Sequence, residues 1–216
     1  PAADSVLDMI RVACYVHQIS EAAEMLQYAH DMGYETSLNI MAISVAGDRE
    51  IDQALEVART TPAEIVVIVD SYGHLYREQI DYLAKKYLDA ISDTGKELGI
   101  HAHNNLQLAF ANTIEAIILG ANRVDGSMMG LGRGAGNCPM EILLGFLRNP
   151  KFDQRPVLNA IQSDILPLRE EIDWGPSIPS QLTGQMNMHP KAAMEFRAGE
   201  TPEDYVGFYD QLLVET

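Results

Sequence analysis

Short β-branched runs alternate with longer amphipathic stretches up to residue 127, and this alternation constrains the fold more than any other feature. We predict strands at 9–15, 36–43, 64–70, 99–103 and 123–127. The run Ile-Val-Val-Ile-Val in the third is continuously apolar, which is typical of a strand buried on both faces of a parallel sheet. Helical patterns separate the runs, at roughly 20–31, 50–59, 79–98 and 106–119. Strict strand–helix alternation predicts a parallel α/β fold, either an open doubly wound sheet or a closed barrel.

The strand signal stops after residue 127, and the remaining sequence reads as helices at 139–147, 157–171, 185–197 and 202–213. Five strands do not close an eight-stranded barrel. The sheet is therefore expected either to be open or to lack three strand–helix units. The chain begins with Pro1 and not with Met, which fits an N-terminus that has been trimmed.

The charge of the chain limits its partners. The formal net charge is −16 over 216 residues, without a basic run, so nucleic acid and anionic membranes are poor partners. An anionic substrate can still bind where a metal reverses the local field. Two cysteines and ten methionines fit a protein of the reducing cytoplasm, and no apolar run approaches the ~18 residues of a membrane span.

Two histidines stand at the end of the fourth predicted strand. His101 and His103 are alternate residues, so their imidazoles are expected on the same face, at the edge where parallel α/β proteins build their sites. Such a pair suits Zn²⁺, Mn²⁺ or Fe²⁺, with oxygen ligands completing the shell. A hydrogen-bonded pair without metal is the alternative. Asn104 and Asn105 favour the metal, because they can orient its ligands.

A glycine-rich loop, GLGRGAGN over 130–137, follows the fifth predicted strand. Its start matches the dinucleotide-binding G-x-G-x-x-A pattern, but that pattern needs a second strand afterwards, and only helical sequence follows. We prefer a loop whose glycines let the backbone approach a ligand. Asn137 is then either a plain helix N-cap, the simpler interpretation, or an N-cap whose amide oxygen also reaches the metal.

Other polar residues lie in or near the predicted strands. Asp70 and Ser71 end the third strand, where they bind substrate, support the metal shell or form a turn. Arg11 and Asp125 lie inside predicted strands, where a buried charge needs a partner. Either the two residues neutralise one another, or Arg11 binds an anion. His189, before Pro190, is more typical of a surface or capping residue than of a catalyst. We find no Ser/His/Asp or Cys/His nucleophile.

The stretch 99–144, GIHAHNNLQLAFANTIEAIILGANRVDGSMMGLGRGAGNCPMEILL, resembles the HMG-CoA lyase-like metal-dependent TIM-barrel family, the DRE-TIM metallolyases. The shared features are His-x-His-Asn at a strand end, an Ala-Asn helix, a Val-Asp-Gly strand and the Gly-x-Gly…Gly-Asn loop. RVACY, DMGYETS and VDSYG look most like the 4-hydroxy-2-oxovalerate aldolase branch, so the resemblance covers about 8–148. It implies strands four to eight of a (β/α)8 barrel in residues 1–150, without the first three, followed by a C-terminal helical region in 151–216.

The resemblance also implies site residues. His101 and His103 would bind a divalent metal, which Asn137 approaches or joins, and Ser71 would contact a substrate carboxylate. The family's Arg-Asp pair on its first strand has no counterpart here. The branch uses a tyrosine after the barrel as an acid/base, but LTGQMNMHPKA contains none. His189 is our candidate to replace it as the catalytic residue.

The implied activity is a divalent-metal-dependent aldolase or lyase that cleaves or forms a carbon–carbon bond in a 4-hydroxy-2-oxo acid through a metal-bound enolate. Mn²⁺ is the first choice of metal, with Mg²⁺, Zn²⁺ and Co²⁺ as alternatives. The branch implies a homo-oligomer and an aldehyde dehydrogenase partner. The rivals are a Claisen-type acyl-CoA synthase of the isopropylmalate synthase branch and a non-catalytic barrel domain. We expect these 216 residues alone to be inactive and marginally stable, because five units leave two sheet edges open.

Overall fold

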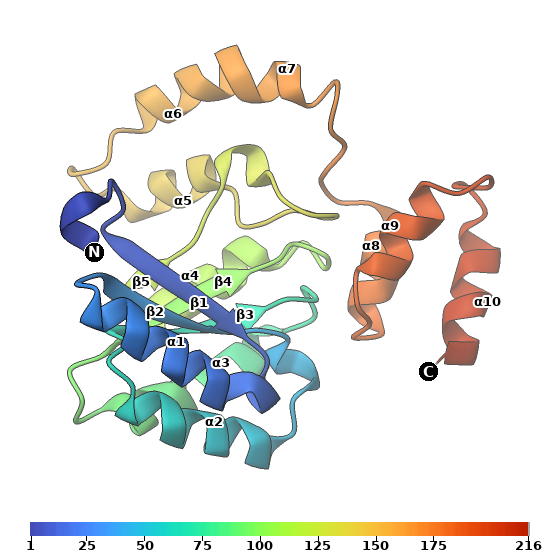
Figure 1. The fold of residues 1–216 in the computed structure, drawn as a ribbon. Coiled ribbons are helices and arrows are strands. Elements are labelled where there is room, and N and C mark those ends of the chain that lie inside the picture. Colours follow the sequence, from blue (N-terminus) through green and yellow to red (C-terminus); the bar gives the residue numbers. More distant parts are fainter. Residues whose placement is uncertain (216) are drawn as a thin grey trace. The chain divides into compact units, whose positions relative to one another are not determined.

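The computed structural model describes residues 1–215 and contains one five-stranded sheet, in which the strands lie in chain order (Figure 1). The pairs β1–β2, β2–β3 and β4–β5 are parallel, and Ser37 pairs with both Arg11 and Ile65. The predicted parallel α/β fold is confirmed. The strands are β1 (Met9–Cys14), β2 (Glu35–Ile40), β3 (Ile65–Asp70), β4 (Glu97–Ala102) and β5 (Arg123–Val124).

A helix follows each strand. The α-helices are α1 (Ile19–Asp31), α2 (Asp48–Thr60), α3 (Arg77–Ile91), α4 (Ala109–Leu119), α5 (Met140–Leu147), α6 (Gln154–Ala160), α7 (Leu166–Leu168), α8 (Ile178–Gln185), α9 (Lys191–Arg197) and α10 (Tyr205–Glu215). Shorter 3₁₀ turns are η1 (Ala2–Asp4), η2 (Val16–Gln18), η3 (Ile43–Val45) and η4 (Met128–Gly130), and a π-helical turn, η5 (Ile161–Ile165), joins α6 to α7. No helix in the described residues is long and apolar enough to cross a membrane.

The chain forms two compact units. The first comprises Pro1–Ser71, Tyr76–His101 and Ile114–Val124, and the second comprises Tyr72–Leu75, Ala102–Thr113 and the remainder from Asp125. In the first unit α2 packs against both α1 and α3 beside the sheet (Figure 1). The helix periodicity explains this packing: α2 buries Ile51, Ala54, Leu55 and Ala58, which lie on one face.

Strand β3 is the centre of the first unit, and all six of its residues are buried, as the apolar run predicts. Ile65, Val67 and Val69 form a cluster on one face, against which Met9 and Met41 pack. The alternate residues Val66 and Ile68 are fully buried on the other face. Such two-sided burial is the reason that no polar alternation is present in the strand.

The C-terminal part of the second unit differs from the prediction. We expected one helix over 185–197, but α8 ends at Gln185 and α9 begins at Lys191. Asn187 has a φ of 52°, the left-handed conformation that ends helices, and Pro190 carries no N–H to continue one. Beyond this break, α9 and α10 share a small core in which the rings of Phe196 and Phe208 stack with centroids 4.3 Å apart.

Candidate active site

The end of β3 in the first unit carries two of the predicted substrate-binding residues. Asp70 is 1% exposed and Ser71 is 8% exposed. The Ser71 hydroxyl accepts a hydrogen bond of 2.8 Å from the backbone N–H of Ala42, a residue held at a left-handed φ of 51°. Ser71 therefore has a structural role at the end of β2, and its O–H remains chemically able to donate.

Two other predictions about charged strand residues need correction. Arg11 is in β1, a strand at the edge of the sheet, and its side chain is exposed. Asp125 is not inside a strand: β5 ends at Val124, and Asp125 is half-buried. Neither residue is the buried ion that the sequence indicated. His101 lies in β4, as predicted, and is half-buried.

In the second unit the glycine-rich loop runs beside His103. His103 and Asn137 form an isolated antiparallel bridge, and Asn104 N–H donates to Gly136 O at 2.9 Å. Two positions of this loop leave little room for a side chain. A Cβ on Gly132 would lie 2.4 Å from Asn137 Nδ2, and a Cβ on Gly136 would lie 2.1 Å from the Gly130 carbonyl oxygen. The loop is thus folded closely around Asn137, next to the second histidine.

The predicted N-cap role of Asn137 is wrong. The N-cap of α5 is Pro139, without a side-chain cap, and Asn137 Nδ2 instead donates to Leu131 O at 3.0 Å. Its Oδ1 is buried and has no hydrogen-bond partner among the described residues. An unsatisfied buried carbonyl oxygen costs stability unless something fills its lone pairs.

This orphaned oxygen supports a metal site. Amide oxygen and imidazole nitrogen are both donors for the divalent ions expected from the sequence. The structure contains no group of three or more His, Cys, Asp or Glu side chains arranged for a metal within residues 1–215. Within the second unit, His103 and the Asn137 Oδ1 are donors of the kinds that a divalent cation accepts.

The loop is anchored by a segment that lies far along the chain. Trp174 is 2% exposed, and its indole N–H donates to the Met129 carbonyl oxygen at 3.0 Å. The Gly175 N–H donates to Gly134 O at 2.9 Å. These two bonds fix the loop on the side of Gly136, whose Cβ would approach the Trp174 ring.

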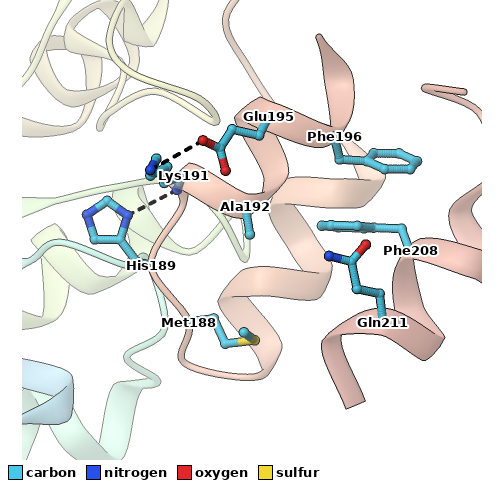
Figure 2. A pocket seen from close by; sticks show the side chains of 8 residues that line it. All are labelled: Met188, His189, Lys191, Ala192, Glu195, Phe196, Phe208 and Gln211. Carbon is cyan, nitrogen blue, oxygen red and sulfur yellow. Dashed lines mark hydrogen bonds and ion pairs between the residues drawn. The ribbon is translucent and has the colours of Figure 1, made fainter. Parts of the chain in front are cut away.

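His189 lies in the turn between α8 and α9, with its ring edge against Tyr72 at a centroid distance of 5.5 Å. Its Nδ1 accepts a hydrogen bond of 3.1 Å from the Lys191 backbone N–H (Figure 2). Partial burial, with the positive charges of Arg133 and Lys191, lowers the pKa of His189. His189 also lines a pocket of about 340 Å³, with Met188, Lys191, Ala192, Glu195, Phe196, Phe208 and Gln211.

Sequence reasoning missed the contacts that hold α8 and His189, including that of Asn105, which was expected to orient metal ligands. His74 Nδ1 donates to the Gly184 carbonyl oxygen at 2.7 Å, and Asn105 Nδ2 donates to Ser180 O at 3.3 Å. Tyr72, beside His189, follows Ser71 directly. The only sequence signal for these contacts was the position of Tyr72 and His74 just after a strand end, where sites are built.

The cysteines are not nucleophiles in this arrangement. Burial raises the pKa of Cys14 to about 11, and the charge of Glu21 adds to the effect. Burial also raises the pKa of Cys138, although a hydrogen bond with Thr113 opposes the shift. Both side chains are therefore neutral thiols at pH 7.

The family model of HMGL-like proteins matches residues 11–163, a range that contains both histidines and the glycine-rich loop. The chain belongs to the HMGL-like family. Curated proteins of similar sequence include 4-hydroxy-2-oxovalerate aldolase of Bacillus thuringiensis, which is 32% identical over 182 residues, 81% of this chain and 52% of the relative. Oxaloacetate decarboxylase of Mycobacterium tuberculosis is 31% identical, over 76% of this chain and 49% of the relative.

Solved structures agree with this membership. The N-terminal domain of a Bacteroides vulgatus protein assigned as an aldolase matches with a TM-score of 0.76 and 30% identity, covering 90% of this chain and 65% of that one. Hydroxymethylglutaryl-CoA lyase of Pseudomonas aeruginosa matches with a TM-score of 0.65 at 19% identity, covering 77% and 65%, and shows the shared fold. The HMGL-like chain described above spans about half the length of the curated relatives it matches.

Proposed function

We propose that this chain is part of a divalent-metal-dependent aldolase that cleaves a carbon–carbon bond in a 4-hydroxy-2-oxo acid. The observation that carries the proposal is the buried, unpartnered Oδ1 of Asn137 beside His103. Family membership and the relatives named 4-hydroxy-2-oxovalerate aldolase support the reaction class. The relative named oxaloacetate decarboxylase also has a 2-oxo acid in its name, which supports the same substrate class.

His101, His103 and Asn137 would hold the cation, for which Mn²⁺ is the first choice. The bound cation supplies a Lewis acid for the 2-oxo carboxylate group. The neutral imidazoles and the amide add no negative charge to the site. The positive charge of the cation would therefore not be neutralised by its ligands and could attract an anionic substrate, although the chain has a net charge of −16.

Polar side chains of the chain would bind and orient the substrate. Ser71 would donate its O–H to the substrate carboxylate while its oxygen accepts from the Ala42 N–H. Asp70, 1% exposed, would support the site at the same strand end, and Arg11, exposed on β1, would attract the anion. His189 would be the catalytic residue. We further propose a cytoplasmic homo-oligomer that acts with an aldehyde dehydrogenase.

The test uses the full-length protein that contains this chain. After removal of metal, Mn²⁺ should restore stoichiometric binding and release of pyruvate from 4-hydroxy-2-oxovalerate, with oxaloacetate as a second substrate. His103→Ala should abolish Mn²⁺ binding, whereas His30→Ala, an exposed histidine on α1, should leave it unchanged. Mn²⁺ binding unaffected by His103→Ala would refute the site. Bound metal without cleavage of either substrate would refute the reaction class.

A further inference from the structure

The ring of His189 is held in one tautomer by its own turn. Its Nδ1 accepts the N–H of Lys191 at 3.1 Å, and a nitrogen that accepts cannot carry the proton of a neutral imidazole. The proton therefore lies on Nε2. Figure 2 shows the other ring nitrogen pointing away from Phe196 and Phe208, which line the pocket behind it.

We propose that His189 is a fixed Nε2–H hydrogen-bond donor for an anionic oxygen of the bound substrate, and not a general base. The proposal rests on the proposed aldolase function and deepens it. The lone pair that a base would use is on Nδ1 and is occupied by the backbone. The group that removes the substrate proton must then be another residue.

The charges around His189 favour this role. Arg133 from the glycine-rich loop and Lys191 from α9 both place positive charge near the ring, and Tyr72 lies against its edge. Lys191 forms an ion pair with Glu195 at 3.3 Å, which offsets part of its positive charge. Two cations nevertheless lie near the ring of His189, in a chain whose net charge is −16. Partial burial and these cations lower the pKa of His189 and keep the ring neutral at pH 7. An anion near Nε2–H gains from the same charges that oppose imidazolium formation.

A purely structural role makes the opposite prediction. In that case His189 only caps the first turn of α9 through Nδ1, and Nε2 has no function. The two ring nitrogens can be separated by isosteric amides. Asparagine can accept the N–H two residues on, in the manner of Nδ1, whereas the longer glutamine can place an N–H donor near the position of Nε2. Both variants lose the ring contact with Tyr72, so this loss does not affect the comparison between them.

The experiment compares His189→Asn with His189→Gln in the full-length enzyme. If Nε2–H donates to an anionic oxygen, His189→Asn should lower kcat/KM by about 10- to 150-fold, and His189→Gln should retain much more activity. If the reverse order is found, or equal losses, the proposal is overturned. Melting temperatures of both variants separate loss of the cap from loss of the donor.

A second measurement does not depend on activity. In ¹⁵N-histidine-labelled full-length protein, His189 should show a pyridine-type Nδ1 and a pyrrole-type Nε2 at pH 7, and oxalate should shift the Nε2–H signal. A pyrrole-type Nδ1, a charged ring or no response to oxalate would contradict the inference. If oxalate shifts the signal but no 2-oxo acid is cleaved, the proposed reaction fails and the donor assignment stands.

Discussion

Adding one methyl group at Gly132 tests whether Asn137 is a metal ligand. Gly132 does not have the positive φ that favours glycine, so its φ does not exclude alanine. The new Cβ would lie 2.4 Å from Asn137 Nδ2 and 3.0 Å from its Cγ. The amide must move, and its hydrogen bond to Leu131 O must lengthen or break.

The cost follows from these contacts. Overpacking a well-filled site costs about 1–3 kcal/mol, and the lost amide hydrogen bond accounts for about 0.5–1.5 kcal/mol of that range. We therefore expect Gly132→Ala to lower the free energy of unfolding by about 1–3 kcal/mol. Displacement of Oδ1 should also weaken Mn²⁺ binding by at least about 10-fold, the smallest effect typical of disturbing a partner around a metal.

Two measurements on the full-length protein separate the effects: denaturant unfolding of the metal-free form, and Mn²⁺ titration of the folded form. The matched control is Gly145→Ala in the middle of α5, where the nearest atom to the new Cβ is a Gln154 side-chain nitrogen at 3.8 Å. This control should gain about 0.5–1 kcal/mol from helix propensity and keep its Mn²⁺ affinity. Destabilised Gly132→Ala with unchanged Mn²⁺ affinity would remove Asn137 from the metal site.

Three further changes test the fold that carries the site. Lys96→Met should lower the free energy of unfolding by about 1.5–3 kcal/mol in urea, because its ammonium group donates to two loop carbonyls at 2.6 and 2.8 Å. Burial raises the pKa of Glu64, but hydrogen bonds from Thr36, with smaller contributions, outweigh burial and hold the pKa below its ordinary value. The stability that the charged Glu64 adds at neutral pH is lost as the pH falls through this lowered pKa. Glu64→Gln should therefore make the free energy of unfolding depend less on pH in the acid range. Gly184→Ala should cost about 1–3 kcal/mol by thermal unfolding, because its Cβ would lie 2.9 Å from Asn105 Cβ.

The strands were predictable from the sequence because their signal is local. In β3 every residue is buried, so the run of Ile and Val alone indicates the strand and its two-sided burial. The helices were less predictable at their ends. The expected helix 79–98 ran into β4 because the sequence around Gly95, with a φ of 74°, contains no proline to mark the end of α3 at Ile91. The break between α8 and α9 depends on the left-handed Asn187, which periodicity does not reveal.

The candidate site was likewise predictable from the sequence only in part. Alternation along the strand predicted a shared face for His101 and His103; β4 contains His101 and ends at Ala102, and the pairing of the two imidazoles stays a prediction. The loop sequence could not decide between a cap and a ligand for Asn137, because an asparagine before a helix has the same appearance in both cases. The structure excludes the cap, because Pro139 is the N-cap of α5. The ligand role stays a proposal, which is supported by the two ends of one amide: Nδ2 donates to Leu131 O, and Oδ1 is buried without a hydrogen-bond partner among the described residues. The contact of His189 with Tyr72 joins distant parts of the chain, so only the packed structure could bring it to light. Non-local packing therefore determines which polar residues can act together, and local patterns determine only which are available.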